Sequence, residues 1–147
     1  MADTPVDILL VEDSPDDVEL TLRTLNKHLV TVRIEVVRDG AEALDYLLCT
    51  GPHANRSIDL KPGLVLLDLK LPKLSGLEVL RAIKSDPRTR TIPIVVLTSS
   101  SEDRDIAEAY QFGVNSYIVK PVDFQQFDEA IRQVGLYWLL LNYRPGK

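Results

Sequence analysis

Only one cysteine, Cys49, occurs among the 147 residues of the chain, so no disulfide can form within it. A chain without disulfides suits a reducing compartment, and we expect a cytoplasmic protein. No apolar run approaches the roughly 20 residues that a membrane-spanning helix requires. The first residues include an acid, Asp3, where an export signal carries basic and then long apolar residues. These absences favour a protein that is neither exported nor held in a membrane.

An excess of basic residues is also missing. Lys and Arg number 17 against 22 Asp and Glu, which gives a formal net charge of -5 and a pI near 5.0. Binding to a nucleic-acid backbone needs a concentrated basic face, so we expect no nucleic-acid partner. With 45% hydrophobic residues, the chain suits one globular domain. We expect a single domain over residues 1–147, with a core at about 6–135 and no output domain.

The most informative stretch is the apolar run Gly63–Pro72, in which Leu and Val residues lead to a single carboxylate, Asp68. A continuous apolar run of this length is typical of a strand buried on both faces of a parallel sheet. In open α/β sheets, ligands bind in the crevice beyond the carboxyl ends of the strands. Asp68 is therefore placed for chemistry rather than for packing.

Apolar runs alternate with amphipathic segments five times along the chain. We predict strands at 6–11, 32–37, 63–67, 92–97 and 116–119, and helices at 15–29, 40–48, 76–85, 102–112 and from 124 to about 143. Right-handed crossovers between parallel strands place helices on both faces of the sheet. We predict an α/β fold of the flavodoxin-like, doubly wound type, with five parallel strands in the order 2-1-3-4-5 and five helices.

Two segments stand outside this alternation. Residues 49–61 contain Gly, Pro, Asn and Ser without periodicity, and such loops are usually functional or disordered. We interpret this segment as a surface insertion, with contact to a partner as the alternative. The last helix carries one apolar stripe that the core needs (Phe127, Ile131, Val134, Trp138 and Leu141) and a second that the core does not need (Leu136, Leu140 and Tyr143, with Tyr137 and Leu139 nearby).

Four of the five predicted strands end on polar residues of chemical interest: Glu12 and Asp13, Asp68, Thr98 and Lys120. If the first and third strands are neighbours, the three carboxylates share a small volume, and their repulsion raises at least one pKa unless a cation lies among them. Mg²⁺ is favoured, because it takes oxygen ligands and few carboxylates. Taken singly, Asp13 is equally well explained as a helix cap, and Thr98 and Lys120 as a strand-end cap and a solvated cation.

These residues resemble the receiver domain of two-component response regulators over nearly the whole chain. The matching pieces are Ile8–Asp13, Leu66–Pro72 followed by Gly76, Val96–Ser99 and Tyr117–Pro121. The resemblance implies that Asp68 accepts a phosphoryl group from a sensor histidine kinase, and that Glu12, Asp13, Asp68 and the backbone carbonyl of Lys70 surround Mg²⁺. It also implies that Lys120 and Thr98 contact the phosphoryl oxygens, and that no external substrate is turned over.

We assign Tyr117 and Pro121 to a switch. A phosphoryl group on Asp68 offers the Thr98 hydroxyl a strong acceptor, which would draw the loop at 98–101 inward. Tyr117 could then move into the space left behind; the alternative is a half-buried strand aromatic with no such role. The resemblance further implies that the bond between Lys120 and Pro121 is cis.

The apolar tail at 136–147 suggests contact with another protein, because a helix that is apolar on more than one side should be covered on more than one side. We expect a homodimer through the last strand and the C-terminal helix, with an exposed aromatic end as the alternative. The length of the chain, the loop at 49–61, the run Asn115-Ser116-Tyr117 and the Leu-rich tail resemble the small response regulators paired with cyanobacterial phytochromes. That resemblance implies a light-regulated histidine kinase as phosphoryl donor.

Two other classes of protein share this fold. An aspartyl phosphatase carries its nucleophile and a second acid two residues apart at the end of the first strand, whereas Glu12, Asp13 and Ser14 follow one another here. A flavin or nucleotide binder needs glycines or hydroxyls that form a phosphate cradle after the first strand. Two carboxylates at that place would repel a phosphate.

Overall fold

The computed structural model describes residues 6–29, 31–143 and 145. The first five residues, where we expect no export signal, lie outside the described residues, as do positions 144, 146 and 147 of the tail. Within the described part of the chain, no helix is both long and apolar enough to cross a lipid bilayer.

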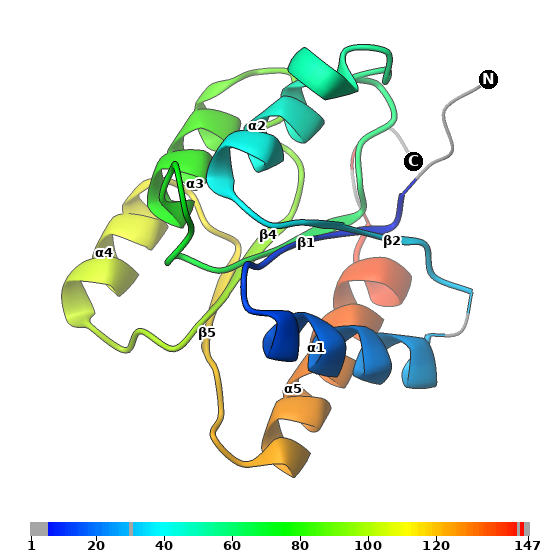
Figure 1. The fold of residues 1–147 in the computed structure, drawn as a ribbon, viewed down its shortest axis with the longest axis vertical. Coiled ribbons are helices and arrows are strands. Elements are labelled where there is room, and N and C mark those ends of the chain that lie inside the picture. Colours follow the sequence, from blue (N-terminus) through cyan, green and yellow to red (C-terminus); the bar gives the residue numbers. More distant parts are fainter. Residues whose placement is uncertain (1–5, 30, 144, 146–147) are drawn as a thin grey trace.

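Five parallel strands form one sheet in the order β2-β1-β3-β4-β5 (Figure 1). The strands are β1 (Ile8–Val11), β2 (Ile34–Val37), β3 (Leu64–Leu67), β4 (Ile94–Thr98) and β5 (Ser116–Val119). The predicted strand order is confirmed, and the strand ends differ from prediction by at most two residues. β1, β3 and β4 are buried along their whole length, as expected for apolar strands covered on both faces.

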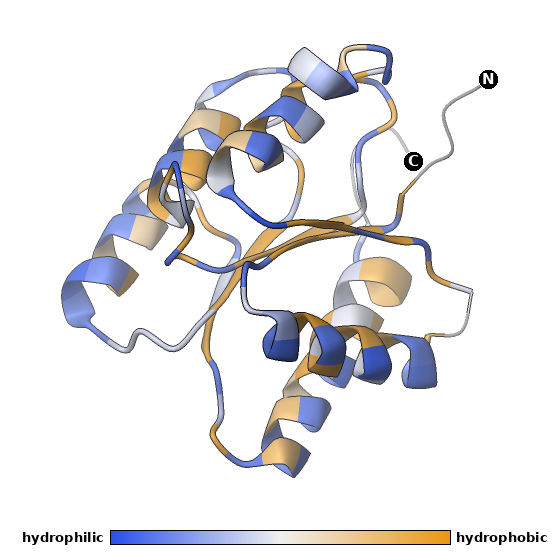
Figure 2. Ribbon diagram, in the orientation of Figure 1, coloured by the Kyte–Doolittle hydropathy of each residue, from blue (hydrophilic) through white to orange (hydrophobic). Residues whose placement is uncertain are grey.

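Five helices cover the two faces of this sheet. They are α1 (Pro15–His28), α2 (Gly40–Leu48), α3 (Gly76–Ser85), α4 (Asp103–Gln111) and α5 (Phe124–Leu136). Figure 1 shows α1 and α5 side by side on one face, and α2, α3 and α4 on the other. Each face has its own apolar cluster, and Figure 2 shows apolar residues along the strands and polar residues on the outer sides of the helices.

The register of the sheet brings the two acidic strand ends together. Val11 at the end of β1 lies beside Leu67 at the end of β3, and the Asp68 amide donates to the Val11 carbonyl at 3.1 Å. Glu12 and Asp68 therefore leave adjacent strands at the same level. On the other side of β3, the Lys120 amide donates to the Thr98 carbonyl at 2.7 Å, which fixes the end of β5 against β4.

Local sequence signals set the starts of the helices that follow these strand ends. The Ser14 hydroxyl accepts a hydrogen bond from the Asp17 amide, and the Asp123 carboxylate accepts one from the Gln126 amide. Ser and Asp side chains are among those that most often cap the start of a helix in this way. Gly113 follows α4 with φ +99°, and glycine commonly ends a helix in this way because it lacks a Cβ.

The segment 49–61 is more ordered than we predicted. A 3₁₀ turn covers Gly51–His53, and the Arg56 guanidinium lies 3.7 Å from the centroid of the Tyr46 ring. The same guanidinium donates to the backbone carbonyls of Tyr46 and Leu60. Individual side-chain contacts of this kind, with those of Thr50 to Asp45 and His53 to Glu42, order the segment, and such contacts leave no periodic pattern in the sequence. Its role as insertion or partner contact stays a prediction.

The C-terminal helix also departs from prediction. α5 ends at Leu136 and continues as a π-helical turn, Tyr137–Leu141, instead of running as one helix to about residue 143. A π turn takes up more residues per turn than an α-helix, so it rotates the side chains that follow. Within the turn, Leu139 packs against the core, whereas Leu141, predicted on the core stripe, is 69% exposed. Leu136, the last residue of α5, also packs against the core.

Candidate functional site

Three carboxylates lie together where β1 and β3 end. One oxygen from each of Glu12, Asp13 and Asp68 falls within 4.8 Å of the others. Glu12 and Asp68 are buried and Asp13 is exposed, so the cluster is open to solvent on one side only. The carboxylate cluster predicted from the sequence is therefore present, and it contains the three acids that we named.

Lys120 supplies a positive charge at this cluster. Its ammonium nitrogen donates to Glu12 Oε1 at 2.7 Å and to Asp68 Oδ2 at 3.3 Å. Lys120 is the first residue after β5, and its stem reaches past β4 and β3 to the end of β1. The alternative reading of Lys120 as a solvated cation is wrong, because only 12% of its side chain is exposed.

A fourth carboxylate, Asp17, was missed by the sequence reasoning. Asp17 Oδ2 accepts a hydrogen bond from the Lys120 ammonium at 2.7 Å, as short as the bond to Glu12. Asp17 lies in the first turn of α1, where an acid is already explained by the helix dipole. The sequence therefore carried no separate signal for its contact with Lys120.

Burial and charge shift two pKa values in the site. Burial, together with the nearby charge of Asp68, raises the pKa of Glu12 to about 7, although the hydrogen bond from Lys120 acts in the opposite direction. Burial opposes the charge on Lys120, but its hydrogen bonds to Asp17 and Glu12 outweigh that effect and raise its pKa above the usual value. Lys120 thus stays protonated while the acids around it compete for its charge.

The Lys70 amide contributes to the geometry at Asp68. It donates to Asp68 Oδ1 at 3.3 Å, which turns one carboxylate oxygen toward the loop after β3. The implied role of the Lys70 backbone carbonyl as a metal ligand stays a prediction. Gly76 opens α3 directly against this loop, because a Cβ at that position would lie 2.2 Å from the Asp68 carbonyl oxygen.

The loop after β4 connects Thr98 to Tyr117 through one residue, Ser100. Thr98 is fully buried, and its hydroxyl accepts a hydrogen bond from the Ser100 amide at 3.4 Å. The Tyr117 hydroxyl donates to the Ser100 carbonyl at 2.9 Å, while the Ser100 hydroxyl donates to Asp105 in α4 at 2.6 Å. Tyr117 therefore already lies against the loop that the predicted switch would move.

The cis bond that we expected between Lys120 and Pro121 is wrong for this structure. No peptide bond among residues 6–29 and 31–143 is cis. The trans form of a bond to proline is favoured by about 0.5–1 kcal/mol. With this bond trans, the Lys120 ammonium reaches all three of its carboxylate partners, so the site geometry does not require the cis form.

The donor set at the strand ends fits a hard divalent cation. Carboxylate oxygens are the ligands that Mg²⁺ prefers, and it binds through few of them while keeping several waters. The three acids supply those oxygens on one open side of the cluster, and their mutual repulsion would be relieved by a cation.

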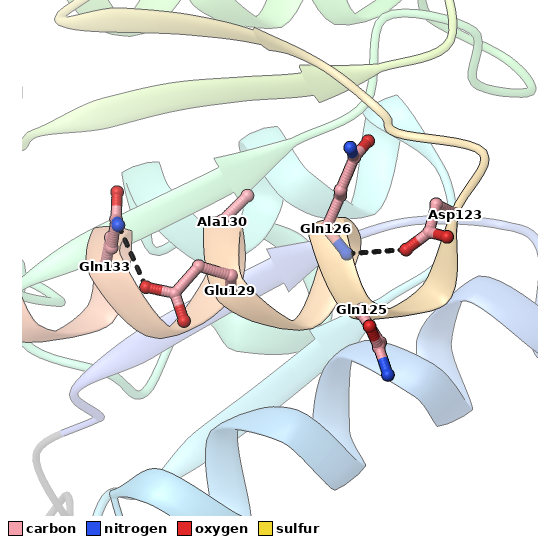
Figure 3. Close-up of a pocket in the computed structure, with 6 residues that line it drawn as sticks. All are labelled: Asp123, Gln125, Gln126, Glu129, Ala130 and Gln133. Atoms are coloured by element: carbon pink, nitrogen blue, oxygen red, sulfur yellow. Dashed lines mark hydrogen bonds between the residues drawn. The ribbon is translucent and has the colours of Figure 1, made fainter.

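A groove elsewhere on the surface does not include this site. It has a volume of about 490 Å³, follows α5, and is lined by amide and carboxylate side chains (Figure 3). Glu129 in this groove accepts a hydrogen bond from Gln133, and Asp123 accepts one from the Gln126 amide. None of the predicted site residues lines this groove, so the acidic strand ends remain the candidate site.

Sequence comparison identifies relatives over almost the whole chain. Residues 8–132 match the response regulator receiver domain family. The probable methanogenesis regulatory protein FilR2 of Methanothrix harundinacea is 46% identical over 145 residues, which cover 99% of this chain and 91% of that protein. The response regulator Rcp1 of Synechocystis is 36% identical over 135 residues, which cover 92% of this chain and 90% of that protein.

Solved structures agree with the sequence comparison. The phosphorylated cyanobacterial phytochrome response regulator RcpA superimposes with a TM-score of 0.89 at 40% identity, over 97% of this chain and all of that one. The Mn²⁺-bound form of Rcp1 superimposes with a TM-score of 0.88 at 35% identity, with the same coverage. Three observations lead to one assignment: the five parallel strands in the order 2-1-3-4-5, the acidic cluster beside Lys120, and the family match over residues 8–132. The chain belongs to the response regulator receiver domain family.

Proposed function

We propose that this protein accepts a phosphoryl group on Asp68 in a reaction that depends on Mg²⁺. The observation that carries the proposal is the position of Asp68, which lies within 4.8 Å of the ligand atoms of Glu12 and Asp13 and receives a hydrogen bond from Lys120. A buried carboxylate with one ammonium and two further acids beside it is suited to phosphoryl transfer, because the transition state spreads negative charge over the equatorial phosphoryl oxygens.

The residues of the site have distinct roles in this proposal. An oxygen of Asp68 attacks phosphorus, and the bond to the donor breaks as the new bond to Asp68 forms. Lys120 neutralises charge on the phosphoryl oxygens, and the Thr98 hydroxyl donates to one of them. Glu12, Asp13, Asp68 and the Lys70 carbonyl would hold Mg²⁺, and the bound ion would supply further positive charge against the phosphoryl group. Later hydrolysis of the acyl phosphate resets the protein, so no external substrate is turned over.

The phosphoryl donor is a sensor histidine kinase, and the relatives RcpA and Rcp1 favour a kinase of the phytochrome type. FilR2 is described as a probable methanogenesis regulatory protein, so a pathway of that kind is the second candidate. A cytoplasmic location follows, because the kinase obtains its phosphoryl group from ATP. We infer that this receiver domain passes its signal on through contact with another protein.

The proposal predicts that Asp68→Asn abolishes phosphorylation. Asparagine keeps the shape of the side chain but lacks the nucleophilic carboxylate. The protein is incubated with Mg²⁺ and a small phosphodonor, and intact mass is measured for the wild type and the variant. We expect a phosphoryl addition on the wild type that is lost in base and absent from Asp68→Asn. Equal mass addition on both proteins would show that Asp68 is not the acceptor.

The proposed switch predicts a change at Tyr117. The phosphoryl group would draw Thr98 and the following loop inward, and the Ser100 carbonyl, which now accepts from Tyr117, would move with it. We expect Tyr117 to change its orientation when beryllofluoride, a phosphoryl mimic, is bound. Crystal structures with and without the mimic test this expectation. An identical Tyr117 rotamer in both would remove Tyr117 from the switch.

A further inference from the structure

Lys120 has no unused hydrogen-bond donor in this structure. An ammonium group offers three N–H donors, and those of Lys120 are directed at three carboxylates: Glu12 and Asp17, each at 2.7 Å, and Asp68, at 3.3 Å. The bond to the proposed phosphoacceptor is the longest of the three. A phosphoryl oxygen can therefore contact Lys120 only after one of these carboxylates is displaced.

The three carboxylates differ in how easily they can be displaced. The Glu12 and Asp68 side chains are only 5% and 10% exposed, whereas that of Asp17 is 33% exposed. A carboxylate that leaves an ion pair for water loses less than one that stays buried without a partner. Glu12 and Asp68 also belong to the acidic cluster that fits a cation, and Asp17 does not.

The surroundings of Asp17 give it room to move. A cavity of about 190 Å³ lies beside the ion pair of Asp17 and Lys120. Both residues line it, together with apolar side chains such as Leu20 and Phe127. The Asp17 backbone is held in the first turn of α1 because its N–H donates a hydrogen bond to the Ser14 hydroxyl. Only the Asp17 side chain therefore needs to turn. The carboxylate, which is already 33% exposed, can turn away from Lys120 toward solvent while the helix stays in place.

We propose that Asp17 is a positioning residue that holds Lys120 in the unphosphorylated protein and competes with the phosphoryl group for it. This inference rests on the proposed function of Asp68. Breaking the ion pair between Asp17 and Lys120 then adds to the free-energy cost of phosphorylation. Asp17 therefore lowers the affinity of the site for a phosphoryl group. Its negative charge beside Lys120 adds repulsion against the incoming anion.

The test compares the affinity for beryllofluoride of four proteins at saturating Mg²⁺: wild type, Asp17→Asn, Asp17→Glu and Asp16→Asn. Asp17→Asn removes the competing charge and should tighten beryllofluoride binding about three- to tenfold, as expected for a partly exposed ion pair. Asp17→Glu restores a carboxylate and should return the affinity toward that of the wild type. Asp16→Asn is the matched control, because it removes the same charge from an exposed residue of the same turn. It should change the affinity for beryllofluoride by less than about twofold.

Calorimetry of Mg²⁺ binding without beryllofluoride separates this role from a general structural one. Asp17 is outside the acidic cluster, so Asp17→Asn should change Mg²⁺ affinity no more than Asp16→Asn does. Equal beryllofluoride affinities for Asp17→Asn and Asp16→Asn would overturn the inference, and so would weaker binding by Asp17→Asn. If the wild type binds no beryllofluoride at all, the proposed function fails, and this inference fails with it.

Discussion

Glu12 links the acidity of the solution to the occupancy of the proposed metal site. The residue is buried, with 3% of its surface exposed, and burial beside Asp68 raises the pKa of its carboxyl group to about 7. A metal ion binds only the ionised carboxylate, so protons compete with the ion below the pKa. The same shift bears on stability without metal. Since the folded pKa lies above the unfolded value of 4.5, the stabilising effect of the neutral form is lost as the pH rises through 7.

We therefore predict that Mg²⁺ affinity is nearly constant above pH 7.5 and falls below pH 7 by about tenfold per pH unit. Isothermal titration calorimetry at pH 8, 7 and 6 measures this dependence. Glu12→Gln serves as the control, because it should bind Mg²⁺ more weakly and with less dependence on pH. A dissociation constant that is the same at pH 8 and pH 6 would show that Glu12 does not titrate with the metal.

At this scale the sequence identified most of the site but not its hydrogen bonds. Glu12, Asp13, Asp68, Thr98 and Lys120 were recognised because each follows a predicted strand. Asp17 was not recognised, because a helix-start acid has an ordinary explanation and its partner lies 103 residues away in the chain. The cis bond before Pro121 came from resemblance alone, and it is absent here.

Helix α3 is placed by a glycine rather than by its apolar face alone. A Cβ on Gly76 would lie 2.2 Å from the Asp68 carbonyl oxygen and 2.6 Å from the Leu69 Cα. These are backbone atoms of the loop that carries the proposed phosphoacceptor, so they cannot give way without moving Asp68. Gly135 in α5 is a useful contrast, because its added Cβ would meet the flexible end of Leu29 at 2.6 Å.

We predict that Gly76→Ala lowers the free energy of unfolding by about 1–3 kcal/mol, the usual cost of overpacking. It should also weaken Mg²⁺ binding, because the loop after β3 must shift. Gly135→Ala should cost less, since Leu29 can adopt another rotamer and alanine favours the helix by about 1 kcal/mol. Urea unfolding monitored by circular dichroism compares the two variants. If both variants lost the same free energy of unfolding, the close approach at Gly76 would not be the cause of the destabilisation.

Elements were predicted well where a periodic pattern defines them and poorly where a single contact does. The buried strands β1, β3 and β4 are nearly continuous apolar runs, which is the strongest signal a short strand can give. The segment at 49–61 depends on individual contacts such as Arg56 over Tyr46 and Thr50 to Asp45, and the π turn at Tyr137–Leu141 depends on how the end of α5 meets the core. Neither leaves a periodic trace in the sequence.

Exposed apolar residues mark one end of the whole molecule. Tyr137, Leu140, Leu141 and Tyr143 are between 49% and 98% exposed. β5 is an edge strand of the described sheet and is only half-buried, and such edges readily pair with another chain. We propose that two copies associate through β5 and the C-terminal helix, which would remove both features from water.

This proposal predicts that the double variant Leu140→Glu and Leu141→Glu is monomeric. Two charges would be buried in the interface without partners, at a cost that a dimer contact cannot offset. Sedimentation equilibrium should give twice 16.5 kDa for the wild type and 16.5 kDa for the variant. Val122→Glu is the control, because Val122 is fully exposed beyond the end of β5 and should leave the mass unchanged. A wild type that sediments as one copy would exclude the dimer.

The sequence alone determined the fold, because hydrophobic burial acts through the spacing of apolar residues and that spacing is written along the chain. It also determined which polar residues gather at one edge, since parallel strands all end on the same side. Only the tertiary structure decided which of those residues touch. Lys120 holds Asp17 as well as Glu12 and Asp68, and hydrogen bonds of this kind depend on distances of a few tenths of an ångström that no sequence pattern encodes.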